Sequence, residues 1–229
     1  AWTSGCVSES AAGEGNLALA AGGGAALQQG FPYTEGGAEY AFVDGWSLEF
    51  TKYVVVIGNV RLSDPDSGDV VGSFDGPVIV DLTEGGGLNH DLAIVTGLPA
   101  KRLDIEFSFL QATASATNQN AAQSDVDTMI ADGLSYIIEG EASRDGETVE
   151  FSFHLPVASR YYRCNNGVDQ TRGIAIEADK TTDAMIYAHA LHLFWDTLAA
   201  GDEDLRFDAF AAVAGEDGLV DEQELLDQD

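Results

Sequence analysis

Four histidines are the side chains of this sequence best suited to chemistry, because imidazole binds copper, zinc and iron. His189 and His192 form a His-x-x-His motif, whereas His90 and His154 stand apart from it. Residues three apart in a regular strand face opposite ways, so the pair can share an ion only where the strand bends or becomes helical. We expect a metal site that uses His189 and His192 with His154 or His90, and copper is favoured over zinc.

The alternative is a structural role for each histidine. His154 lies on the polar side of an alternating segment and would then be a solvent-facing strand residue. His192 would be a hydrogen-bonded ring beneath Trp195. Convergence of the imidazoles decides between the two interpretations, because metal–nitrogen bonds are only about 2 Å long.

The C-terminus carries the second half of a calcium-binding EF loop. Asp217, Asp221 and Glu224 stand at ligand positions of such a loop, and Gly218 stands at its sharp turn. Val213 and Gly215 occupy positions that normally supply carboxylates. The sequence therefore argues against calcium binding at Asp217, Asp221 and Glu224 and favours a loop shape kept for packing.

Motifs of catalysis are missing from the sequence. It contains no Gly-x-Ser-x-Gly elbow, no phosphate-binding loop and no dinucleotide fingerprint. Aspartate and glutamate are so frequent that pairs of carboxylates arise by chance and cannot indicate acid–base catalysis. We expect a binding or assembly protein and no enzymatic activity.

The charge balance restricts the partners. The chain has 229 residues, with 39 acidic and 10 basic side chains and a formal charge of -29. Such a surface repels nucleic acid and anionic lipid and attracts cations and basic proteins. The second functional hypothesis is therefore a metal-free structural or accessory subunit of a cell-surface or electron-transfer assembly, which docks a basic partner through its acidic surface.

Two cysteines bear on location. Cys6 and Cys164 could form one long-range disulfide in an oxidising compartment. Alternatively, Thr3-Ser4-Gly5-Cys6 is similar to the end of a bacterial lipoprotein signal, in which Cys6 would carry a lipid anchor. Both interpretations predict a periplasmic or extracellular protein. No segment reaches the ~18–20 apolar residues that a membrane helix needs.

The hydrophobic pattern predicts a mostly-β fold, an antiparallel β-sandwich with a short helical C-terminal tail. Residues 1–14 read as a flexible leader, and residues 15–229 as a single domain whose tail covers about 197–229. The strongest signal is a hairpin with Arg144-Asp145-Gly146 at its turn. A short helix is expected near residue 125. Strands are expected at residues 16–21, 46–50, 53–57, 78–82, 103–110, 134–142, 148–155, 174–178 and 185–193.

Three segments resemble a family of uncharacterised secreted or lipoprotein-type bacterial proteins. They are Asp44-Gly45-Trp46-Ser47-Leu48-Glu49-Phe50, His189-Ala190-Leu191-His192-Leu193-Phe194-Trp195-Asp196 and Leu205-Arg206-Phe207-Asp208-Ala209-Phe210 with the EF half-loop behind it. That family usually has His-Gly-Asp-His, so the Gly-Asp is missing here.

A more distant resemblance is to MbnP-like proteins, the periplasmic copper-binding partner proteins of methanobactin operons. It rests on Met129, on residues 136–140 and on Phe151-Ser152-Phe153-His154-Leu155. This resemblance implies copper binding through histidine, including His154, and a dihaem-type redox partner. The tryptophans that follow the methionine in those proteins are absent, so their oxidised-tryptophan chemistry does not carry over.

Overall fold

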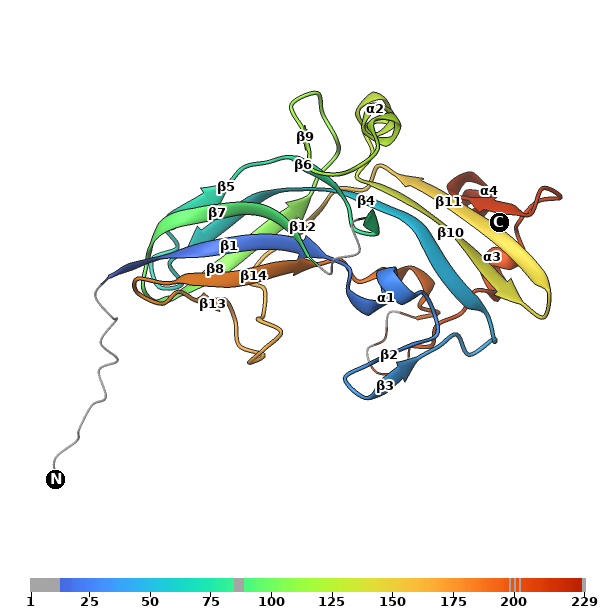
Figure 1. Ribbon diagram of the computed structural model, residues 1–229, viewed down its shortest axis with the longest axis horizontal. Coiled ribbons are helices and arrows are strands. Elements are labelled where there is room, and N and C mark those ends of the chain that lie inside the picture. The colour runs from blue at the N-terminus through green and yellow to red at the C-terminus, as the bar shows by residue number, and fades with distance from the viewer. Residues whose placement is uncertain (1–12, 85–88, 198, 200, 202, 228–229) are drawn as a thin grey trace.

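The computed structural model describes residues 13–84, 89–197, 199, 201 and 203–227. They form a mostly-β, sandwich-like fold, as the sequence predicts, although the sheets are mixed and not purely antiparallel. The long β4 (Ser47–Ser63) runs along the length of the molecule and carries partners at both ends (Figure 1). None of the helices in this part of the chain is long and apolar enough to span a membrane.

The smaller sheet has the strand order β14-β1-β7. Its strands are β1 (Glu14–Gly22), β7 (His90–Pro99) and β14 (Thr181–Tyr187). β1 pairs in parallel with β14 and antiparallel with β7. Leu17, Leu19 and Ala21 alternate along β1 and are fully buried, so this face of the sheet points into the core.

The larger sheet has the order β12-β8-β4-β10-β11-β15 along its main path. Those strands are β8 (Arg102–Phe109), β10 (Tyr136–Arg144), β11 (Glu147–Leu155), β12 (Ser159–Tyr161) and β15 (Leu219–Asp221), together with β4. Four further strands pair with its members: β5 (Val70–Phe74), β6 (Val78–Asp81), β9 (Thr117–Asn118) and β13 (Ile174–Ala175). A separate ribbon joins β2 (Tyr33–Glu35) to β3 (Ala38–Tyr40).

The predicted hairpin is confirmed as β10 and β11, which pair antiparallel from Tyr136 opposite Leu155 to Arg144 opposite Glu147. Asp145 and Gly146 make the turn with φ of 53° and 88°. Two successive residues with positive φ fit the right-handed twist of a two-residue hairpin. The turn therefore fixes which side chains of β11 face the core.

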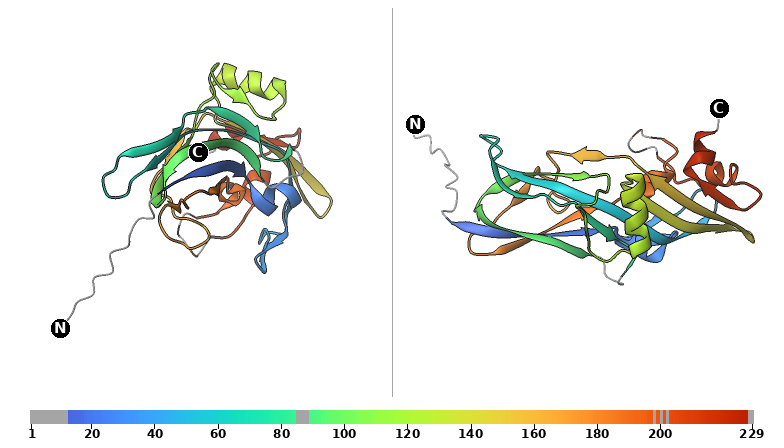
Figure 2. Two further views of the ribbon diagram at one scale, coloured as in Figure 1. Left: turned by 60° about the vertical axis from the view of Figure 1, so that its left-hand side comes forward. Right: turned by 90° about the horizontal axis from the view of Figure 1, so that it is seen from above.

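The two faces of β4 bury different groups. Tyr53, Val55 and Ile57 face the interior between the sheets, whereas Val54 and Val56 pack beneath the helix α2 (Gln123–Asp132). The helix lies outside the larger sheet, on the side away from β1 and β14 (Figure 2). Both faces are apolar, which explains the continuous hydrophobic run at residues 53–57.

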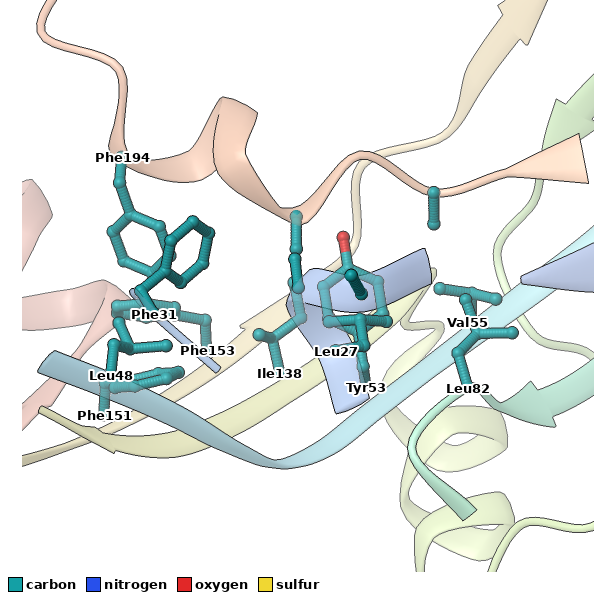
Figure 3. Packing of buried hydrophobic residues seen from close by; sticks show 14 of the residues in the cluster. Leu27, Phe31, Leu48, Tyr53, Val55, Leu82, Ile138, Phe151, Phe153 and Phe194 are labelled. Atoms are coloured by element: carbon teal, nitrogen blue, oxygen red, sulfur yellow. The ribbon is translucent and has the colours of Figure 1, made fainter. Parts of the chain in front are cut away.

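The interior is dominated by aromatic rings. Figure 3 shows Phe31, Phe151, Phe153 and Phe194 packed over Leu48. Phe194 lies 6.1 Å from Phe151 between ring centroids, and Trp46 is only 2% exposed. These contacts join the C-terminal part of the chain to the larger sheet.

The tail contains two short helices, α3 (Asp208–Ala211) and α4 (Glu222–Leu226), as its helical spacing predicts. Asp44 anchors α3, because its Oδ2 accepts hydrogen bonds from the backbone N–H groups of Phe207 at 2.7 Å and Asp208 at 2.9 Å. Trp46 donates from Nε1 to Asp208 at 3.0 Å, and the Arg144 guanidinium lies 4.5 Å above the Trp46 ring.

Several predicted boundaries were wrong. The strand expected at 185–193 ends at Tyr187, and a 3₁₀ helix, η2 (Ala190–Phe194), follows it. β5, β7 and the helix α1 (Gly24–Gln29) were not predicted. The leader expected over 1–14 overlaps β1 at Glu14, and its first twelve residues lie outside the described part of the chain.

Candidate functional site

His189 and His192 are brought together by the change from strand to 3₁₀ helix. His189 is the last extended residue before η2, and its carbonyl accepts from the His192 N–H at 3.2 Å. A 3₁₀ helix has three residues per turn, so positions i and i+3 lie one above the other. The two rings are accordingly stacked, with centroids 5.0 Å apart and planes 10° apart.

Aromatic rings flank the pair on both sides. Tyr187 lies 4.5 Å from His189 and Trp195 lies 4.0 Å from His192, both measured between ring centroids. The contact with Trp195 is the one that the structural interpretation of His192 expects. The stack with His189 brings the two imidazoles close together, as the metal hypothesis expects, but nearly parallel rings do not point their nitrogens at one ion.

Both imidazoles are exposed side chains that neighbouring groups partly desolvate, and this favours their neutral form. The pKa of His189 is lowered by desolvation first and then by the neighbouring His192, and the pKa of His192 is lowered by desolvation against an opposing effect of Glu203. The neutral ring is the form that binds metal ions. The pair is therefore held in its ligating form at neutral pH.

His154 lies on the other side of the larger sheet. It is opposite Ile137, whose own partner on β4 is Val54, and those two residues pack beneath α2. Its Nε2 is 3.8 Å from a carboxylate oxygen of Glu139, which also pairs with Lys52 at 3.0 Å. The structure thus does not bring His154 to the stacked pair.

His90 is also separate from the pair. It begins β7, and its Nδ1 lies 3.2 Å from the Asn120 side-chain nitrogen. That Asn120 nitrogen also donates to the Asp81 carbonyl at 2.8 Å, so Nδ1 of His90 acts as the acceptor and Nε2 carries the proton. Within the described ranges, no three His, Cys, Asp or Glu side chains are placed to hold one ion.

The C-terminal acidic residues serve the local backbone. Asp221 caps α4 by accepting from the N–H groups of Gln223 and Glu224, both at 2.9 Å. The Oε2 atom of Glu224 accepts a hydrogen bond from the Asp221 N–H at 3.2 Å, which completes a capping box. Asp217 accepts from the Leu219 N–H at 3.3 Å. These bonds account for the shape of the loop.

A large cleft adjoins the histidine pair, and sequence reasoning did not find it. Its volume is about 1020 Å³, and both His189 and His192 line it. Residues of the larger sheet line it, from β4, β8, β10, β12 and β13, together with residues of β14 and η2. The alternation of Ile105, Phe107 and Phe109 along β8 was a signal, but it is equally typical of an ordinary core strand.

Cys164 lines the same cleft and is half-buried, and burial raises the pKa of its thiol. Its proposed bridge to Cys6 concerns a residue outside the described ranges.

Comparisons of the chain with protein-family models, with curated proteins and with solved structures gave no match. The site must therefore be interpreted from its own geometry.

Proposed function

We propose that the protein binds a copper-type metal ion through His189 and His192 and holds or delivers it, without turnover, outside the cytoplasm. The stacked pair of neutral imidazoles supports this proposal. Neutral imidazole is the commonest protein ligand for such metals. Imidazole ligands suit copper as well as zinc, and the choice of copper follows the sequence prediction.

The residues fit an ion only after a small rearrangement. Two nitrogens bound to one ion are at most ~4 Å apart, because each bond is about 2 Å long. The ring centroids are 5.0 Å apart and nearly parallel, so at least one imidazole must turn toward the other. A turn of His192 would weaken its contact with Trp195 and would give metal binding a fluorescence signal at that tryptophan.

Copper titration of the matched histidine variants tests the proposal. Cu(I) competition with the chelator bathocuproine disulfonate should show one site per chain in the wild type. The double variant His189→Ala, His192→Ala should lose it, because both predicted ligands are gone. His154→Ala is the control, since His154 lies on the opposite face of the sheet and should leave the affinity unchanged. An unchanged affinity in the double variant would overturn the proposal.

A second candidate function is a metal-free accessory subunit that docks a basic partner, such as a redox protein. The observation that favours it is charge. Nine of the ten basic side chains already pair with carboxylates of this chain, which leaves a large excess of acidic side chains. The nine are Lys52, Arg61, Lys101, Arg102, Arg144, Arg160, Arg172, Lys180 and Arg206.

Titration with a basic c-type cytochrome tests this candidate. Binding should weaken steeply as NaCl rises from 20 to 300 mM, because screening removes the attraction between opposite charges. It should not change in the double histidine variant. Equal binding of a basic and an acidic cytochrome would refute docking through charge.

A further inference from the structure

The cleft beside the histidine pair has the composition of a site for an apolar molecule. Six phenylalanine and tyrosine residues contribute to its lining: Tyr53, Phe107, Phe109, Tyr136, Tyr161 and Tyr187. Their rings contact one another, with Phe107 stacked on Tyr161 at 5.0 Å and Phe109 at 5.3 Å from Tyr136. A volume of about 1020 Å³ is at the upper end of the range for small-molecule sites.

Charge is nearly absent from this lining. Among the described residues, the charged side chains that line the cleft are Arg102, Asp169 and Asp183. Arg102 is bonded to Asp169 at 2.8 Å, so no cation is left there to receive an anionic headgroup. The overall charge of -29 also repels anions. An uncharged ligand therefore fits this cleft better than a carboxylate amphiphile.

The Tyr53 hydroxyl is the polar group of the cleft that is best placed for an apolar ligand. Tyr53 is only 4% exposed, and its hydroxyl has no hydrogen bond to any residue in the described part of the chain. Figure 3 shows this oxygen pointing from β4 toward the segment that connects β14 to η2. Among the described residues, the Tyr53 oxygen is not one of the fully enclosed atoms without a partner, so it can be reached from the cleft. A group that accepts its hydrogen bond therefore gains affinity there.

The phenols of the cleft remain donors over the whole physiological range. Burial raises the pKa of Tyr53, and the neighbouring Tyr136 and Tyr161 add to the rise. Burial also raises the pKa of Tyr136 to about 12. A protonated phenol donates its hydrogen, so its natural counterpart is an oxygen acceptor such as a carbonyl.

We propose that this cleft binds an uncharged, largely apolar small molecule that carries a carbonyl oxygen, and that the Tyr53 hydroxyl donates to that oxygen. The aromatic walls hold the apolar body, and the Tyr53 hydroxyl on β4 sets its orientation. This binding activity is independent of the metal function proposed above, although His189 and His192 lie at the edge of the same cleft.

Displacement of the neutral fluorescent probe N-phenyl-1-naphthylamine tests the proposal on the full chain. The wild type should bind the probe, and 2-undecanone should displace it at lower concentration than undecane or undecanoate. Tyr53→Phe removes only the hydroxyl. It should weaken the affinity for 2-undecanone by about 3- to 10-fold and leave the affinity for undecane unchanged. Absence of probe binding, or displacement by undecanoate equal to that by the ketone, would overturn the proposal.

Two further variants locate the site. Ala184 faces the cleft beside Leu19, so Ala184→Phe should reduce probe binding at least 10-fold. Ile94→Phe is the control, because Ile94 is 66% exposed and does not line the cleft. The double histidine variant should still bind the probe, which separates this result from the copper titration. Equal probe affinity in the Ala184 and Ile94 variants would place binding elsewhere and contradict the proposal.

Discussion

At the residue scale, the histidine pair links the site to acid stability. The pKa of both rings is lower in the folded protein than the ordinary value near 6.5, because partial desolvation of these exposed side chains disfavours the charged form. The unfolded chain therefore binds more protons than the folded chain as the pH falls through about 6.5. The stability that the neutral rings contribute is complete above that pH and is lost below it.

Urea unfolding at pH 7.5 and pH 5.5 measures this loss. The wild type should lose more unfolding free energy between the two values than the double variant His189→Leu, His192→Leu, which has no ring to charge. The comparison with the variant cancels the effect of the many carboxylates, which are common to both proteins. An equal loss in the two proteins would show that desolvation does not shift the two histidines.

Asp44 provides a second prediction at this scale. Its Oδ2 accepts from two backbone N–H groups at the start of α3, so Asp44→Ala leaves both donors without their acceptor. We expect a loss of about 1–3 kcal/mol in unfolding free energy, measured by urea denaturation. Asp44→Asn keeps an oxygen at the same position and should lose less. If both variants lost the same amount, the negative charge rather than the acceptor would hold the tail.

At the element scale, the hairpin turn depends on glycine. Gly146 has φ of 88°, a conformation that a residue with a Cβ adopts at a cost, and nothing lies within 4 Å of the Cβ that alanine would add. Gly146→Ala should therefore destabilise the protein by about 1 kcal/mol through backbone strain alone. Gly167→Ala is the matched control, since Gly167 also has open space around it but no positive φ.

Thermal unfolding of the two alanine variants gives the comparison. Gly167→Ala should be neutral or slightly stabilising, because alanine restricts the unfolded chain. If the two variants were equally stable, the register of β10 and β11 would not depend on the geometry of this turn.

The elements also show what the sequence could predict. β10 and β11 were predictable because their alternation is regular and their turn is typical of a hairpin. β7 was not predictable, because its register slips twice against β1 and Ile94 faces outward. The glycine-rich start of α1 reads as a loop, and burial of Ala25, Ala26 and Leu27 makes it a helix.

The same reasoning applies to the site. The His-x-x-His spacing identified the two residues that do come together, but their convergence depends on the chain leaving the strand at Tyr187. The sequence gives no sign that His154 and the pair lie on opposite faces of one sheet, because that follows from strand order. The cleft is lined in part by β14, which pairs with β1 although most of the sequence separates the two strands.

At the scale of the whole molecule, the dominant property is self-repulsion. The formal charge of -29 is spread over the chain, and most basic groups are already engaged in ion pairs. Folding brings the remaining carboxylates closer together, which destabilises the compact state at low ionic strength. Exposed ion pairs offset little of this repulsion, since each adds at most about 1 kcal/mol to the free energy of unfolding.

Salt should therefore stabilise this protein, against the usual expectation for a chain rich in ion pairs. The Debye length falls from about 30 Å at 0.01 M salt to about 10 Å at 0.1 M, so repulsion between distant carboxylates is screened before the short ion pairs weaken. We expect the midpoint of thermal unfolding to rise between 0.01 and 0.5 M NaCl, and to rise equally in KCl because screening does not depend on the identity of the cation. A midpoint that fell with salt would mean that the ion pairs outweigh the repulsion. A rise confined to one cation would indicate specific ion binding.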